Sequence, residues 1–210
     1  MQKEEMMKIV MAFKAELETY SEQLDLHNKM EEVLRQDMLD CGKLSAGKDK
    51  TGTGERSFVR AVFAMIEGIV FNLKQIALAL SKHGKGSFSQ AELMMLEEVS
   101  YDLDDKGATK SQVKFIPLPK NIKFAFLSAA RAFGVAYELK VDDGGWNRFK
   151  DALVIRNRIT HPKSIDDLQL SDNEIQTVAD AAEWFLKVQR ELIQKMMTKM
   201  EALRDKLDKK

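Results

Sequence analysis

The amino-acid sequence predicts an all-α protein, a helical bundle with long N-terminal and C-terminal helices. Apolar residues recur at steps of three and four through most of the chain, which is the period of an amphipathic helix. Only three of the 210 residues are proline, and we find no strict two-residue alternation of the kind that marks a half-buried strand. Apolar residues at 44% and charged residues at 31% are typical of a soluble, helix-rich globular domain.

The chain divides by composition into three parts. Residues 1–40 are expected to be an N-terminal amphipathic helical segment, with one or two helices over 2–39. The stretch CGKLSAGKDKTGTGER (41–56) is rich in glycine, lysine, serine and threonine, and is predicted to be a linker. It lacks the Gly-x-x-x-x-Gly-Lys-Ser/Thr order of a phosphate-binding loop. Residues 57–210 are predicted to form the helical bundle, with an extended C-terminal helix.

Within the bundle, the broad apolar stripe over 57–81 gives the clearest helix. Ser171 and Glu174 form a capping box that predicts the start of the last helix, and Trp146 and Trp184 are expected to anchor the core. The remaining elements expected are helices over 89–101 and 121–139, a loop or short extended piece over 104–120, and a helix that begins near Trp146.

Bulk charge does not indicate a nucleic-acid or membrane partner, because Lys+Arg and Asp+Glu both number 33. The single Cys41 and three scattered histidines give no metal-ligand spacing, so no metal or cofactor is expected. The N-terminus is too acidic for a signal peptide, and the uninterrupted apolar runs are too short to cross a bilayer. These features favour a cytoplasmic protein with no membrane association.

The stretch RNRITH (156–161) raises the main functional question. Pro162 biases His161 away from helical geometry, so Arg156 is expected in the last helical turn, with His161 reaching across the helix end. A guanidinium and an imidazole would then converge on one anion. The alternative is structural: cations favour the negative end of the helix dipole, and a histidine can cap the last carbonyls. Five cations against the single Asp151 favour a focused positive patch over 146–163, namely Arg148, Lys150, Arg156, Arg158 and Lys163.

RNRITH resembles the Arg-polar-x-x-x-His signature of HEPN domains, a superfamily of helical ribonucleases and nucleotide-binding proteins found in toxin–antitoxin and phage-defence systems. Arg156 stands at the arginine position, Asn157 at the polar position and His161 at the histidine position. The helix over 60–78 resembles an early helix of the family, and the resemblance extends over about residues 55–200. It implies a metal-independent endoribonuclease that acts as a homodimer, with the motifs of both subunits facing one composite cleft.

The resemblance also implies roles for these residues. His161 would exchange protons with the ribose 2′-hydroxyl and the leaving 5′-oxygen, Arg156 would hold the phosphate, and Asn157 would orient His161 or donate to the phosphate. RNA would be the substrate, and an antitoxin or regulatory protein a possible partner. In one branch of the family a tyrosine two residues after the histidine is nucleotidylated; here that position is Lys163. RNA-binding contacts are expected from Arg148, Lys150, Arg158, Lys163 and Arg60.

Two further interpretations stay open. Arg60, Glu67 and Lys74 are seven residues apart and predict a solvated line of ion pairs on their helix; in the HEPN interpretation Arg60 or Glu67 would border the cleft. The alternative function is a non-catalytic module that binds nucleotides or recruits a partner through the terminal helices. In that case the methionines of MMTKM (196–200) would line the partner surface.

Overall fold

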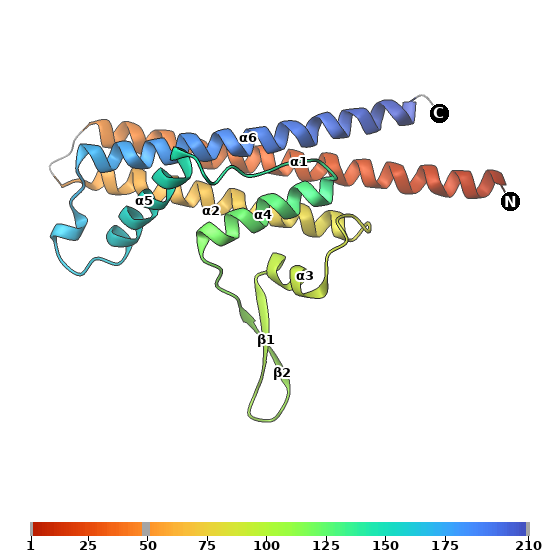
Figure 1. Ribbon diagram of the computed structural model, residues 1–210, viewed down its shortest axis with the longest axis horizontal. Coiled ribbons are helices and arrows are strands. Elements are labelled where there is room, and N and C mark those ends of the chain that lie inside the picture. Colours follow the sequence, from red (N-terminus) through yellow and green to blue (C-terminus); the bar gives the residue numbers. More distant parts are fainter. Residues whose placement is uncertain (1, 48–50, 209–210) are drawn as a thin grey trace. The chain divides into compact units, whose positions relative to one another are not determined.

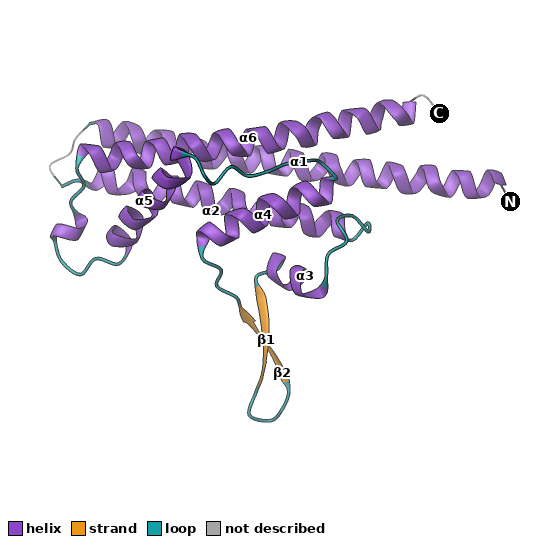
Figure 2. Cartoon of the chain, in the orientation of Figure 1, coloured by secondary structure: helices purple, strands orange, loops and turns teal. Residues whose placement is uncertain are grey.

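The computed structural model describes residues 2–47 and 51–208. Within these residues the fold is all-α with long terminal helices, as the sequence predicts, and holds one small β-hairpin (Figure 1; Figure 2). The elements in chain order are α1 (Gln2–Ala46), α2 (Thr53–Ser81), α3 (Gln90–Leu96), β1 (Val99–Leu103), β2 (Thr109–Val113), α4 (Leu118–Phe133), α5 (Gly144–Thr160), the short 3-10 helix η1 (Asp166–Leu168) and α6 (Asp172–Asp208).

The linker predicted over 41–56 is mostly helical. α1 continues through Cys41 to Ala46 and α2 begins at Thr53, so only residues 47–52 separate the two helices. Glycine is needed at position 54 because a Cβ there would lie 2.6 Å from the carbonyl oxygen of Leu44. The small residues that resemble a linker in the sequence therefore allow the end of α1 and the start of α2 to approach closely.

The chain forms two compact units, and α1, α2 and α6 each contribute to both. Unit 1 comprises Met1–His27, Val70–Glu138 and Leu192–Lys210, and unit 2 comprises Asn28–Ile69 and Leu139–Glu191. Each unit is described separately below.

Unit 1 has a core of aliphatic and aromatic side chains from all four of its long helical segments. The ring centroids of Tyr20 on α1 and Phe133 on α4 lie 4.5 Å apart. His27 is buried and its Nδ1 lies 2.6 Å from Oδ1 of Asn72, so these two polar side chains are hydrogen-bonded to each other within the core. Met196 is also fully buried here, which rules it out as part of an exposed partner-binding stripe.

The β-hairpin of unit 1 is the main departure from the predicted elements. α3 ends at Leu96, earlier than the predicted 101, and β1 pairs with β2 in an antiparallel register that sets Tyr101 opposite Ser111. Glu98 ends the helical path because its φ of 56° lies in the left-handed region. β1 follows the two-residue alternation Val-Ser-Tyr-Asp-Leu, which is too short to be distinguished from the end of a helix, and β2 has no such alternation.

Unit 2 is built around an aromatic cluster. Trp146 lies 5.1 Å from Phe149 and 5.5 Å from Trp184, measured between ring centroids, and both tryptophans are buried. This confirms their predicted role as core anchors. α1 and α2 pack closely beside Gly68, where an added Cβ would lie 2.7 Å from Cδ1 of Leu34.

α2 is long and apolar enough, by length and composition, to cross a membrane. The sequence prediction of no membrane-spanning segment rests on uninterrupted apolar runs, whereas α2 as a whole is apolar although charged residues interrupt it. The most apolar stretch of α2 is 61% buried inside the protein, and the core helices of soluble proteins have the same length and composition.

Candidate functional site at the C-terminal end of α5

α5 is positioned by its two ends and its apolar face. At its start, Oδ1 of Asp143 accepts a hydrogen bond of 2.9 Å from the backbone N–H of Trp146, which is a standard N-cap. The buried residues of α5 recur at steps of three and four and pack this face of the helix into the core of unit 2; they include Phe149, Ala152, Ile155 and Ile159. This rotation leaves Asn157 exposed and Arg156 partly exposed.

Arg156 is held by three neighbours in unit 2. Its Nη2 donates to Oε1 of Glu67 on α2 at 2.6 Å, and its Nη1 donates to Oδ1 of Asn157 at 3.1 Å. Its guanidinium carbon also lies 5.8 Å from the centroid of the Phe63 ring, within the range of a cation–π contact. The side chains of Arg156 and Glu67 are 27% and 45% exposed, so water reaches the ion pair.

His161 caps the C-terminus of α5. Its φ of −125° and ψ of 59° are not helical, as expected for a residue that precedes proline, and its backbone N–H donates to the carbonyl of Asn157 at 3.0 Å. The imidazole is exposed, and within the described residues it makes no hydrogen bond or ion pair. Asn157 is therefore hydrogen-bonded to Arg156 through their side chains and to His161 through the backbone. In the described part of the chain, no hydrogen bond joins the side chains of Arg156 and His161.

The loop after His161 is ordered by one carboxylate. Oδ2 of Asp167 accepts from the backbone N–H of Lys163 at 2.7 Å and from that of Ser164 at 3.0 Å. The hydrogen bond from Lys163 is the main cause that lowers the pKa of Asp167, with smaller contributions from Ser164 and Arg158. This keeps Asp167 ionised and holds the turn that follows the histidine.

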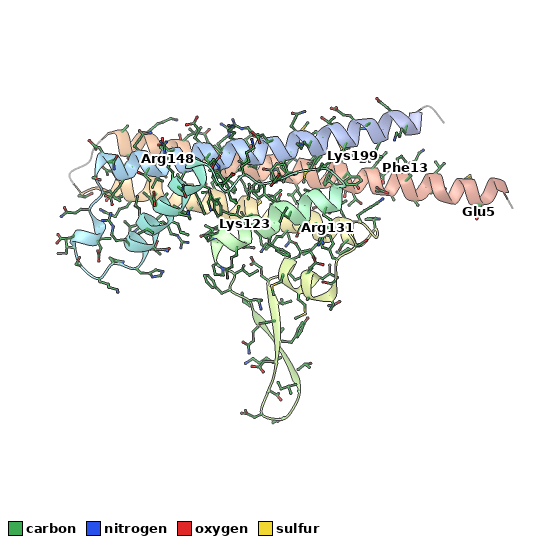
Figure 3. All side chains as sticks on the ribbon, in the orientation of Figure 1. Glu5, Phe13, Lys123, Arg131, Arg148 and Lys199 are labelled. Atoms are coloured by element: carbon green, nitrogen blue, oxygen red, sulfur yellow. The ribbon has the colours of Figure 1, made fainter. Side chains whose placement is uncertain are left out.

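The three arginines of the predicted patch have carboxylate partners from other elements of the chain. Arg158 donates to Oε1 of Glu174 at 2.8 Å, and Arg148 pairs with Asp180 (Arg148 is labelled in Figure 3). Together with the Arg156–Glu67 pair, three of the five cations are neutralised. Lys150 and Lys163 are exposed and have no ion pair within the residues described.

The polar line on α2 is not uniformly solvated. Arg60 is exposed and lies two turns before Glu67 on the same face, about 10 Å along the helix axis. Glu67 contacts Arg156, whereas Lys74 is fully buried in unit 1 and pairs with Glu98. The prediction of a solvated line of ion pairs is therefore wrong for Lys74, and Glu67 is the member of the line that reaches the motif.

The end of α5 carries an arginine held by a carboxylate and, five residues later, an exposed histidine. Arg156 presents a guanidinium, a geometry suited to two-point contact with a phosphate, and histidine side chains exchange protons near neutral pH. Among the described residues no group of three or more histidine, cysteine, aspartate or glutamate side chains is arranged to hold a metal ion.

Comparison of the chain with protein-family models, with curated proteins and with solved structures finds no match. The HEPN resemblance of RNRITH therefore stays a prediction. The sequence does not indicate Glu174 and Asp180 as partners of Arg158 and Arg148, since only the folded chain brings them together. Phe63 was also missed as a contact of Arg156. It belongs to the apolar stripe of α2, and its contact with a cation leaves no signal in the sequence.

Proposed function

We propose that the protein is a metal-independent endoribonuclease of the HEPN type, with Arg156, Asn157 and His161 at its site. One observation supports this most: the motif lies at the end of α5, where Arg156 is held by Glu67 and Asn157 and an exposed His161 follows at the helix cap. A second copy of the chain would supply the other half of a composite cleft, and the setting would be cytoplasmic.

The proposed reaction is attack of a ribose 2′-hydroxyl on the adjacent phosphorus. His161 of one subunit takes the 2′-hydroxyl proton, and His161 of the other gives a proton to the leaving 5′-oxygen. Arg156 donates to the non-bridging oxygens and stabilises the charge that develops on them. The products are a 2′,3′-cyclic phosphate and a 5′-hydroxyl, and DNA is not cut because it lacks the nucleophile.

Glu67 has a defined part in this proposal. Its carboxylate orients the Arg156 guanidinium in the free protein, and a phosphate must share or replace this contact when RNA binds. Arg60, two turns away on the same face of α2, and the exposed Lys150 and Lys163 would contact further phosphates. Arg148 and Arg158 are each paired with a carboxylate, as Arg156 is, so a phosphate would have to share or replace those contacts too.

The test is cleavage of a mixed-sequence RNA by the full-length protein in excess EDTA. His161→Ala and Arg156→Ala are expected to abolish cleavage, whereas His83→Ala, the same change at an exposed loop histidine of unit 1, should leave it intact. A DNA strand of the same sequence should survive. Cleavage that is equal in wild type and in both site variants, or absent in wild type, would contradict the proposal.

A second candidate is a non-catalytic interaction module, and the exposed side chains of the hairpin favour it. Tyr101, Leu103, Val113 and Phe115 are large, apolar and mostly exposed. Such a module would keep its binding activity in His161→Ala and lose it on changes in the hairpin, which separates the two functions.

A further inference from the structure

The β-hairpin of unit 1 has one apolar face and one polar face. Cross-strand partners lie on the same face, so Val99 and Val113 share a face with Tyr101 and Ser111. Phe115 lies two residues beyond the end of β2 and is likewise apolar and exposed. The other face carries polar pairs, and there Nε2 of Gln112 lies 3.5 Å from Oδ2 of Asp102.

The apolar face of the hairpin is uncovered. The exposed fractions of Tyr101, Leu103, Val113 and Phe115 are 58%, 66%, 86% and 85%. Figure 1 shows the hairpin extending away from α3 and α4, and Figure 3 shows its side chains standing out from the ribbon. A large aromatic side chain presents ~150–250 Å² and leucine or valine somewhat less, so the exposed fractions of the four sum to roughly 500 Å². A patch of that size on a monomer is commonly functional.

The base of the hairpin is firmly anchored. Glu98 adopts a positive φ, which is unfavourable for a residue with a side chain, and its carboxylate pairs with the buried Lys74 of α2. Its carbonyl accepts from the backbone N–H of Lys114 at 2.7 Å, and its Oε1 accepts from Nδ2 of Asn121 at 3.3 Å. Since a two-stranded hairpin alone is marginally stable in water, these anchors hold in place a ribbon whose apolar face is left open.

The charges of the hairpin favour a protein surface as its occupant. Between positions 99 and 115 three aspartates balance three lysines, and the charged strand residues occupy the polar face. A neutral hairpin with an uncharged apolar face gives neither the positive charge that nucleic acid requires nor attraction to an anionic membrane. The charged residues of this segment are Asp102, Asp104, Asp105, Lys106, Lys110 and Lys114.

We propose that the hairpin binds the hairpin of a second copy of this chain, apolar face to apolar face. Two patches bury roughly 1,000 Å² in total, which is the lower limit for a specific interface and fits a weak, concentration-dependent dimer. An uncharged face can meet its own copy without like-charge repulsion, as a two-fold interface requires. The inference does not depend on the nuclease proposal, since assembly is measured without RNA.

The first test measures mass against concentration by sedimentation velocity and light scattering. Wild type should change from monomer to dimer within the micromolar range. The double variant Val113→Thr with Phe115→Ser should raise the dissociation constant at least about tenfold, which corresponds to 1.4 kcal/mol. The matched control, Gln112→Thr with Lys114→Arg, changes the neighbouring positions, keeps the charge of the hairpin and should leave the dissociation constant unchanged.

A second measurement uses cross-linking between copies in a Cys41→Ser background. A cysteine introduced at Ser111, on the apolar face, should give a covalent dimer with a short bis-maleimide, and one at Gln112 should give little. A wild type that stays monomeric at every concentration would overturn the proposal and assign the face to a different partner. Equal effects of the two double variants, or equal cross-linking at both positions, would also overturn it.

Discussion

The adjacent glycines at the start of α5 allow a sharp test of the packing in unit 2. A Cβ added at Gly145 would lie 2.0 Å from Cδ1, 2.5 Å from Cγ and 2.9 Å from Nε1 of Trp184. The indole cannot move away easily, because its ring centroid lies 5.5 Å from that of Trp146 and 5.8 Å from that of Phe149. A Cβ added at Gly144 has no atom within 4 Å outside its own helix.

Gly145→Ala should therefore be destabilising relative to Gly144→Ala. Both glycines lie in the first turn of α5, so the two changes in backbone entropy are similar and the difference in stability isolates the clash. Overpacking of this kind usually costs ~1–3 kcal/mol. For a chain of this length each kcal/mol shifts Tm by about 2–4 °C, which gives a Tm of Gly145→Ala roughly 2–12 °C below that of the control. Thermal unfolding followed by circular dichroism and tryptophan fluorescence measures this. Equal unfolding temperatures would refute the packing described for Trp184.

Three further predictions concern charges and pH. Glu98→Gln should lower the free energy of unfolding in urea by about 3–5 kcal/mol, because it leaves the buried Lys74 ammonium unpaired. Lys74→Met should lower it by less, because the Glu98 side chain is 31% exposed and water can solvate its carboxylate. A larger loss for Lys74→Met than for Glu98→Gln would contradict the pairing. The hydrogen bond from the Ser89 backbone, followed by contacts with Arg131 and the Ser89 side chain, lowers the pKa of Glu92 to about 2. The stability this carboxylate gives to α3 is thus present above pH 4.5 and lost as pH falls toward 2, and amide exchange in α3 should lose this acid dependence in Glu92→Gln. Burial, followed by the charge of Glu16, raises the pKa of Tyr20, so stability should fall as pH rises above 10, and Tyr20→Phe should remove that alkaline loss in urea unfolding.

The long elements of the fold could be predicted because each carries a repeated apolar period. The stripe of α2 and the capping box of Ser171 and Glu174 both appear in the structure, and Oγ of Ser171 accepts from the N–H of Glu174 at 3.3 Å. The hairpin could not be predicted, because its strands are five residues long and each has few side chains that contact the rest of unit 1. Its position depends on Glu98 and Lys74, which are 24 residues apart.

The candidate site could be predicted only as far as its local chemistry. Pro162 disfavours a helical conformation of His161, so the sequence indicates where α5 ends. Residues 156–161 then give the polar groups at that end. The electrostatic surroundings depend on pairs between Arg156 and Glu67, 89 residues apart, and between Arg148 and Asp180, 32 apart. A local count of charges includes none of these partners, so it overstates the positive potential around the motif.

The neutralised arginine is compatible with a phosphate site for an energetic reason. An ion pair with this much exposure contributes about 0–1 kcal/mol, because water screens the charges and competes for the donors. A phosphate that accepts two charge-assisted hydrogen bonds from the same guanidinium gains more than that. Glu67 therefore holds Arg156 in one orientation without blocking it. An equally exposed arginine with no carboxylate beside it would carry the same charge but sample many more rotamers.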